Sequence, residues 1–211
     1  MGGMTDCFQP CELQHRVTLN TIKALNKAGI GYLIVTKSHL VAEPEYLEVL
    51  DLNLAHIQIS ITSLDDNLAY SYEKASASTK RILAIQKLQN LGFDISIRLS
   101  PLIEEFMDFH KLDGYKIEKA VVEFLRINSW IKQWLSGVDF SKYTLRHGGY
   151  YHLPLSHKIR ILSNINIPSV TVCDDVTEHY VYWRDHFNPN PFDCCNLRIS
   201  SASPNDLSFE C

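Results

Sequence analysis

The sequence predicts an α/β fold built on a parallel sheet, and two similar segments support that prediction. Residues 22–38 and residues 85–100 each contain an amphipathic helix, a glycine and a short apolar strand. Gly29 and Gly92 stand where glycine commonly ends a helix. A repeated order of helix, glycine and strand is typical of parallel sheets, in which functional side chains gather at the carboxyl ends of the strands.

Length and composition limit the classes to which the protein can belong. A chain of 211 residues is long enough for one sizeable core, and we expect a main unit over residues 1–136 with a C-terminal extension over residues 137–211 that completes or caps it. The net charge of −4 gives no overall attraction to nucleic acid. No apolar run reaches the roughly 18 residues that span a bilayer, and a signal pattern is lacking. A cytoplasmic protein without a membrane partner is expected.

The first half of the chain alternates helices with strands. Helices are predicted where apolar residues recur every three or four positions, and strands where apolar residues run continuously or alternate with polar ones. Pro44 suits the first turn of a helix, and Pro101 is predicted to end a strand. The expected elements are a helix over 13–28, a strand over 32–35, a helix over 45–52, a strand over 56–62, a helix over 76–91 and a strand over 94–99.

The second half has a less regular pattern. Residues 119–126 fit a strand or a helix, and a strand is favoured. The remaining expected elements are a helix over 129–135, a loop rich in tyrosine and histidine over 137–153, a helix over 154–164, a strand over 169–173 and a helix over 178–187, followed by an irregular tail.

Polar residues near the strand ends occur in a specific order. The segments are Gly2-Gly3-Met4-Thr5-Asp6, Gln9-Pro10-Cys11-Glu12, Val35-Thr36-Lys37-Ser38, Ser60-Ile61-Thr62 and Arg98-Leu99-Ser100-Pro101. This set resembles the radical S-adenosylmethionine (SAM) enzymes, in the branch related to spore photoproduct lyase and labelled DNA repair photolyase-like, over roughly residues 2–128. The resemblance implies a partial (β/α)6 TIM-like barrel, a [4Fe-4S] cluster, and reductive cleavage of SAM to a 5′-deoxyadenosyl radical by an iron–sulfur lyase.

The resemblance also implies residues for the methionine end of SAM. Gly2 and Gly3 match the segment that meets the methionine amino group, and Thr5 with Asp6 match a pair serving the same end. Lys37 matches the lysine that binds the SAM carboxylate. A zwitterionic headgroup needs a carboxylate and a cation, which Asp6 and Lys37 supply if they converge. The alternative is a rim salt bridge or two solvated loop charges.

The adenosine end is assigned in the same way. Ser60 matches a residue near the ribose, and Arg98 with Ser100 belong to the strand that approaches the adenosine.

The sequence departs from the family at the cluster loop. A Cys-x3-Cys-x2-Cys loop would precede the Gly2-Gly3 segment, and no such loop occurs in these residues. Cys7 and Cys11 have the first spacing, but Gln14 occupies the third position. We therefore expect an N-terminally truncated barrel that lacks ligands for the cluster and does not form 5′-deoxyadenosine by itself, which anaerobic reconstitution with iron and sulfide tests. Gly3 also replaces the lyase's hydrogen-donating cysteine, so the substrate is left open, with a nucleic acid as one expectation.

Cysteines cluster again near the C-terminus. Cys173, His179, Cys194 and Cys195 are candidate ligands for zinc or an auxiliary cluster, since thiolate and imidazole suit either. Cys173 is also a candidate radical-relaying thiol. Adjacent cysteines are an awkward ligand spacing, and buried thiols without a metal are the simpler interpretation.

The remaining signals have ordinary explanations. The loop residues Tyr143, Arg146, His147, Tyr150, Tyr151 and His152 fit base stacking or, more simply, packing over a core. Trp130 and Trp134, four apart on a helix, are predicted to pack. The acidic pairs 65–66 and 104–105 are predicted to be solvated.

Two further functional classes are kept as alternatives. One is a non-catalytic α/β module that binds SAM or a partner protein, and the other is a zinc-stabilised nucleic-acid binder, against which the acidic balance argues. If a strand is missing beside residues 32–35, the exposed sheet edge is expected to favour self-association.

Overall fold

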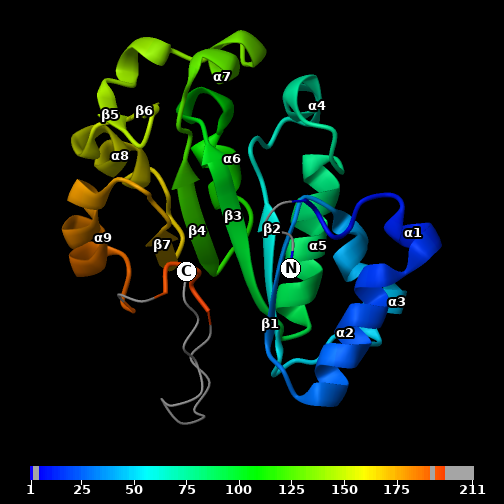
Figure 1. Ribbon diagram of the computed structural model, residues 1–211. Helices are drawn as coiled ribbons and strands as arrows, with labels where there is room; N and C mark the ends of the chain where they lie inside the picture. The colour runs from blue at the N-terminus through cyan, green and yellow to red at the C-terminus, as the bar shows by residue number, and fades with distance from the viewer. Residues whose placement is uncertain (2–4, 191–192, 198–211) are drawn as a thin grey trace.

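A parallel five-stranded sheet forms the centre of the molecule (Figure 1). Residues 1, 5–190 and 193–197 are described in the computed structural model. Within them the sheet has the order β1-β2-β3-β4-β7 and is open, with no pairing between its two edge strands. The strands are β1 Tyr32–Thr36, β2 Ala55–Ser60, β3 Asp94–Leu102, β4 Lys119–Phe124 and β7 Ser169–Val172, and a separate antiparallel hairpin consists of β5 Leu145–His147 and β6 Tyr150–His152.

Helices follow the strands along the chain and lie mainly beside the two ends of the sheet order. Figure 1 shows α2 and α5 beside β1 and β2, and α8 and α9 beside β7. The α-helices are α1 Glu12–His15, α2 Val17–Ala28, α3 Pro44–Leu47, α4 Asp66–Tyr72, α5 Ser78–Asn90, α6 Phe109–Asp113, α7 Ser129–Trp134, α8 Leu155–Leu162 and α9 Tyr180–His186. Short 3-10 turns are η1 His39–Ala42, η2 Glu104–Phe106, η3 Phe140–Lys142 and η4 Thr177–His179. None of the helices in the described residues is long and apolar enough to span a membrane.

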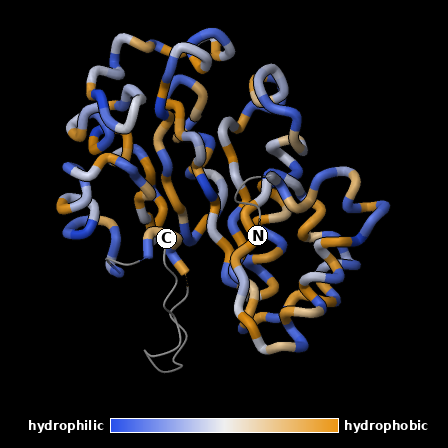
Figure 2. The backbone as a smooth tube through the Cα atoms, viewed as in Figure 1, coloured by the Kyte–Doolittle hydropathy of each residue, from blue (hydrophilic) through white to orange (hydrophobic). Residues whose placement is uncertain are grey.

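Apolar and polar residues alternate along β2 and β3, which gives these two strands one apolar and one polar face; Figure 2 colours the backbone by the hydropathy of each residue. Ile59 of β2 pairs in register with Ile97 of β3, and both are fully buried in the same core as Ile22 of α2. The next positions along the strands, Ser60 and Arg98, also pair in register and point to the opposite face. Parallel strands covered by helices on both faces are usually apolar throughout. A polar face therefore marks the side of the sheet that carries the cavity described below.

The C-terminal part of the chain belongs to this same core. It supplies the edge strand β7, and Ile161 and Trp183 are buried in the hydrophobic cluster that contains the sheet residues. Residues 193–197 return across the polar face. There the Gln58 amide donates to the Cys195 carbonyl (2.7 Å), and the Thr171 hydroxyl donates to the Cys194 carbonyl (2.8 Å).

The helix predicted over residues 13–28 is interrupted at Arg16, whose φ of 52° is left-handed. Glu12 accounts for the interruption, because its buried carboxylate accepts hydrogen bonds from the main-chain amides of Thr18 (2.9 Å) and Leu19 (3.0 Å) at the start of α2. A carboxylate at a helix N-terminus satisfies unpaired amides and interacts favourably with the helix dipole. The chain must turn at Arg16 to bring Glu12 over that end.

The strand predicted to end before Pro101 continues to Leu102. The Ser100–Pro101 peptide bond is cis, and the register of β3 with β4 shifts between Leu99 and Leu102. Proline has no amide hydrogen for the ladder, and an irregularity of this kind is where a sheet tolerates it.

Shorter elements also differ from the prediction. The helix predicted over 45–52 is confined to α3, the predicted loop over 137–153 contains the β5–β6 hairpin, and α4 was not predicted. Asp65 is the N-cap of α4, since its carboxylate accepts from the amides of Asn67 and Leu68, so it is not simply a solvated charge. The strand favoured over 119–126 is confirmed as β4.

Candidate functional site

A cavity of about 520 Å³ lies on the polar face, at the carboxyl ends of the strands. Its lining includes every described residue of the predicted SAM site: Thr5, Asp6, Lys37, Ser60, Arg98 and Ser100. Gly2 and Gly3, the other two predicted residues, lie outside the described residues. Side chains from the N-terminal segment and from three strands thus meet at one cavity.

Asp6 is fixed in place by three hydrogen bonds. Its Oδ1 accepts from the Phe8 main-chain amide (2.8 Å) and the Thr36 hydroxyl (2.7 Å), and its Oδ2 accepts from the Lys37 main-chain amide (2.7 Å). The carboxylate is therefore attached to the end of β1 through main-chain and hydroxyl donors. Phe8 anchors the same segment, since it is buried edge-to-face against Tyr46, 4.9 Å between ring centroids.

Lys37 follows β1 directly, and its ammonium points to a second carboxylate. The Lys37 Nζ lies 2.7 Å from Glu73 Oε2, and Glu73 also forms an ion pair with Arg81. Arg81 is fully buried and donates to the Ser60 carbonyl at the end of β2 (2.6 Å). Burial alone would raise the pKa of Glu73, but Lys37 and Arg81 outweigh it and hold that pKa below its ordinary value.

Asp6 and Lys37 therefore lie on one rim without forming an ion pair with each other. Both also line a neighbouring cavity of about 590 Å³, together with Glu73. Asp6 and Lys37 do not form a salt bridge with each other. The main-chain amide of Lys37 donates to Asp6, whereas the Lys37 ammonium binds Glu73.

The other side of the cavity is organised by Arg98. Its guanidinium donates to Gln58 Oε1 (2.8 Å) and Glu123 Oε2 (2.7 Å), and the Ser100 hydroxyl donates to the same Glu123 oxygen (2.8 Å). Glu123 belongs to β4, so its ion pair with Arg98 links β3 to β4, and Glu123 also lines the cavity. A cation, a carboxylate and hydroxyl groups face one small volume here.

Sequence analysis missed Glu73, Arg81 and Glu123. Glu123 had a usable signal, because residues 119–124 form a strand and Glu123 is its one acidic residue, on the same face as Val121, which pairs with Arg98. Glu73 and Arg81 carried no such signal in the sequence. Charged residues next to or within an amphipathic helix are usually exposed to solvent.

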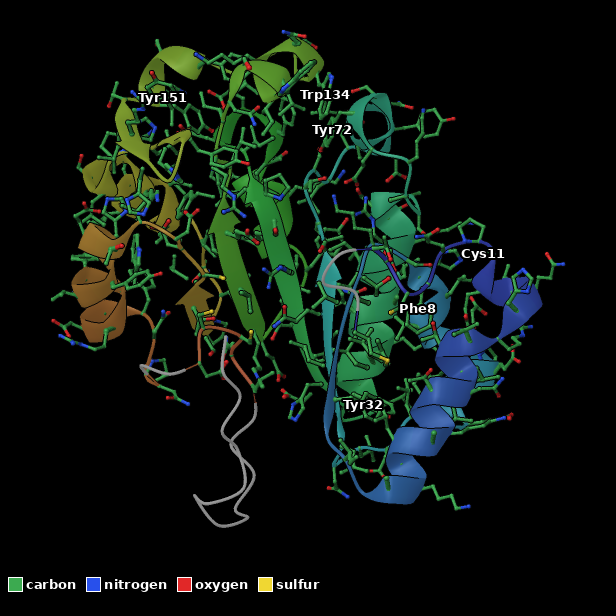
Figure 3. All side chains as sticks on the ribbon, viewed as in Figure 1. Phe8, Cys11, Tyr32, Tyr72, Trp134 and Tyr151 are labelled. Atoms are coloured by element: carbon green, nitrogen blue, oxygen red, sulfur yellow. The ribbon has the colours of Figure 1, made fainter. Side chains whose placement is uncertain are left out.

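Among the residues that the structure describes, neither Cys7 nor Cys11 belongs to a group of three close metal-ligating side chains. Burial raises the pKa of the Cys7 thiol to about 11, while Cys11 is exposed beside α1 (Figure 3). The high pKa of Cys7 disfavours the thiolate that a metal requires.

The C-terminal candidate ligands separate into two places. Cys173 directly follows β7, and its main-chain amide donates to the Val122 carbonyl (2.8 Å), while Cys195 lines the cavity. His179 is instead bound to Asp174, with Nδ1 3.0 Å from Oδ2. Within the described residues, the three thiols and His179 do not form a set of ligand atoms that all lie within 4.8 Å of one another.

One such set does occur, formed by His152, Asp174 and Asp175. Its carboxylates already have cationic partners, because Lys158 Nζ lies 2.7 Å from Asp174 and Arg126 lies 2.6 Å from Asp175. The arrangement is a charge network, buried at Lys158 and Asp174 and exposed at Arg126 and Asp175, that joins the segment after β7 to α8.

The aromatic residues are distributed differently from the prediction. Trp130 and Trp134 are 61% and 73% exposed, so the predicted packing is wrong, and Figure 3 shows Trp134 on α7 above the sheet. Tyr143 and His152 are buried, which favours packing for that part of the loop. Glu104 binds Lys142, His157 and Arg160 and so is not simply solvated.

Comparisons with known proteins support the fold. No family model matches the chain, and no curated protein matches it. Among solved structures, spore photoproduct lyase complexed with dinucleoside spore photoproduct aligns with 80% of the chain at 16% identity and a TM-score of 0.55. A lyase mutant with bound AdoMet and the same dinucleoside aligns with 81% of the chain at 15% identity and a TM-score of 0.56.

A domain of pyruvate-formate lyase-activating enzyme from Bacteroides vulgatus also matches, at 16% identity with a TM-score of 0.51, over 82% of this chain and 99% of that domain. The chain spans 58–59% of the length of the two lyase structures. The resemblance stated from the sequence is thus confirmed at the level of the fold. The parallel sheet of this chain has the fold of the radical SAM enzymes.

Proposed function

We propose that the cavity binds SAM and that the chain is the SAM-binding part of a radical SAM protein whose substrate is unidentified. One observation carries the proposal: six residues, chosen from the sequence for contact with SAM and spread from Thr5 to Ser100, line a single cavity. The cavity volume of about 520 Å³ lies within the roughly 300–1,000 Å³ typical of small-molecule sites.

The methionine headgroup would bind between Asp6 and Lys37. Asp6 Oδ2 accepts a single hydrogen bond, from the Lys37 amide, and a carboxylate oxygen has capacity for a second, as from an ammonium group. The Lys37 ammonium has three donors, and one is directed to Glu73. Asp6 and Lys37 can therefore each bind a ligand group of opposite charge and keep the hydrogen bonds that position them.

The adenosine would lie over Ser60, Arg98 and Ser100. Glu123 adds a carboxylate acceptor on this side, which suits ribose hydroxyl groups.

The residues present do not fit the [4Fe-4S] cluster that the fold family uses. These 211 residues contain no Cys-x3-Cys-x2-Cys sequence, and Cys7 has a raised pKa. Our proposal therefore concerns SAM binding by this chain, and no step through a cluster is assigned to it. Because two of the similar lyase structures hold a dinucleoside spore photoproduct, a nucleic-acid-related substrate is part of the proposal for the whole protein.

Isothermal titration calorimetry with SAM tests the proposal. The unmodified chain should bind SAM, and Asp6→Asn and Lys37→Met should each weaken binding about tenfold or more, which corresponds to the loss of a charge-assisted hydrogen bond. Lys27→Met is the matched control, since Lys27 is an exposed lysine at the end of α2 outside the cavity lining. No binding by the unmodified chain, or equal binding by all variants, would contradict the proposal.

A further inference from the structure

The Gln58 side chain joins the proposed SAM cavity to a segment far along the chain. Gln58 lies on β2, two residues before Ser60 and on the same polar face, and is 1% exposed. Its amide oxygen accepts from Arg98 Nη1 (2.8 Å), and its amide nitrogen donates to the Cys195 carbonyl (2.7 Å). Arg98 and Cys195 both line the cavity. One buried side chain therefore fixes two parts of the cavity wall.

The chemistry of the two contacts explains why an amide occupies this position. A guanidinium group can only donate hydrogen bonds, and a main-chain carbonyl can only accept them. The Gln58 amide has one acceptor and one donor group, so it satisfies Arg98 and the Cys195 carbonyl together. A carboxylate of the same length would keep an acceptor for Arg98 but would offer no donor to the carbonyl.

Residues 193–197 are held against the polar face at further points. The Thr171 hydroxyl of β7 donates to the Cys194 carbonyl (2.8 Å), and the Asn196 side-chain amide donates to the Ala120 carbonyl of β4 (3.1 Å). With the contact from β2, the segment is attached to three strands of the sheet. Its position is therefore set by the protein before any ligand enters the cavity.

We propose that residues 193–197 form the wall of the cavity beside the adenosine of SAM, and that Gln58 positions this wall relative to Arg98. The inference rests on the proposed function, in which the adenosine lies over Ser60, Arg98 and Ser100. Arg98 and the segment are held in place beforehand, so binding does not bear the cost of ordering them. The C-terminal part of the chain thereby contributes to SAM affinity through a positioning residue on β2.

Alkylation of Cys195 by N-ethylmaleimide tests the wall in the unmodified chain. Trypsin releases Cys194 and Cys195 in peptide 185–198, and fragmentation of that peptide identifies the modified residue. SAM at about ten times its Kd leaves roughly a tenth of the sites free, so the alkylation of Cys195 should slow about tenfold. Cys11, which is exposed and lies outside the cavity lining, should react at an unchanged rate.

Two substitutions of Gln58 separate its two contacts. Gln58→Met removes both, so it should weaken SAM binding about tenfold in calorimetry. Without SAM, it should also speed the alkylation of Cys195 about fivefold, because the segment opens more often. Gln58→Glu keeps the acceptor for Arg98, so it should speed alkylation as much as Gln58→Met but weaken SAM binding only about threefold. A general loss of stability would not separate the two readouts in this way.

Gln89→Met is the matched control. Gln89 also bridges two main-chain groups, since it donates to the Lys116 carbonyl (2.8 Å) and accepts from the Glu118 amide (3.3 Å), but it lies outside the cavity lining. Gln89→Met should leave SAM affinity and the alkylation of Cys195 unchanged. Equal losses of affinity in Gln89→Met and Gln58→Met would overturn the positioning role of Gln58.

The remaining outcomes distinguish this inference from the proposed function. If the unmodified chain does not bind SAM, the proposed function fails and the inference fails with it. If the chain binds SAM but SAM does not protect Cys195, the inference fails and the proposed function stands. The same holds if Gln58→Met, or Gln58→Glu with faster alkylation of Cys195, binds SAM as tightly as the unmodified chain.

Discussion

Glu73 holds Lys37 at the rim of the cavity: Lys37 Nζ and Glu73 Oε2 are 2.7 Å apart, and the Glu73 side chain is only 9% exposed. The same carboxylate binds the fully buried Arg81, which in turn binds the main chain of β2 at Ser60. Lys37 is thus positioned relative to two strand ends through one carboxylate. Glu73 would therefore position Lys37 for a ligand without contacting that ligand itself.

Replacing Glu73 by Gln should weaken SAM binding by about fivefold to tenfold, because the amide keeps the size but not the charge that orients Lys37. Calorimetry of Glu73→Gln against the unmodified chain measures the effect, and Glu118→Gln, at an exposed glutamate, is the control. Equal affinity in Glu73→Gln, with clear binding by the unmodified chain, would rule out the positioning role while leaving the proposed function intact.

Arg81 should be essential for stability. Its substitution by Met leaves Glu73 with Lys37 as its remaining cationic partner and removes a donor from the Ser60 carbonyl. Breaking a buried ion pair in this way typically costs about 3–5 kcal/mol of the free energy of unfolding. Urea denaturation of Arg81→Met measures it. Lys80→Met, at the exposed neighbour on α5, should change the midpoint little, and a similar small change in Arg81→Met would contradict the prediction.

Acid should weaken the fold through Glu104. Burial favours the neutral acid, but hydrogen bonds from His157, Arg160 and Lys142 outweigh it and lower the pKa of Glu104 from 4.5 to about 2. A lowered folded-state pKa gives stability that is present above pH 4.5 and is lost as the pH falls toward 2. Glu104 and its partner Arg160 are in contact with solvent, which screens these interactions, so about 1 kcal/mol of the free energy of unfolding should be lost between pH 6 and pH 3.

Glu104→Gln should show a correspondingly smaller loss over the same pH range, measured by urea denaturation at each pH. Glu118→Gln should retain the full pH dependence of the unmodified chain. Identical pH profiles for Glu104→Gln and the unmodified chain would show that Glu104 does not contribute.

The strand pattern predicted where polar side chains should gather, whereas the individual site residues were assigned from the family resemblance. Thr36 and Ser60 end β1 and β2, Arg98 of β3 pairs in register with Ser60, and the carboxyl ends of parallel strands meet at one edge of the sheet. Residues placed there by pattern are therefore brought together by the fold. The alternation in residues 56–62 is also visible in the sequence, and in the structure its polar positions share a face with the cavity-lining Ser60 and Arg98.

Contacts between segments that are distant in the sequence could not be predicted, because they leave no repeating pattern of residues. The Gln58 side chain binds the main chain of Cys195, 137 residues away, and any residue at position 195 offers the same carbonyl. Glu73 and Arg81 look solvated until the fold buries them. The exposure of Trp130 and Trp134 was equally hidden, because their spacing describes the face of a helix but not whether anything covers it.

Lys158 provides a second buried charge whose removal should unfold the C-terminal part of the core. The Lys158 side chain is fully buried, its ammonium lies 2.8 and 2.7 Å from the two Asp174 oxygens, and Asp174 also accepts from the Trp183 indole (2.9 Å). Lys158→Met should cost about 3–5 kcal/mol, because it leaves a buried carboxylate without its cation.

The double variant Lys158→Met/Asp174→Asn separates charge from packing. If the uncompensated carboxylate causes the loss, then neutralising Asp174 should recover part of the free energy of unfolding lost in Lys158→Met, whereas a loss due only to packing should not be recovered. Lys116→Met, at an exposed lysine, is the control. Urea denaturation of the three variants decides the matter, and a double variant less stable than Lys158→Met would contradict the electrostatic explanation.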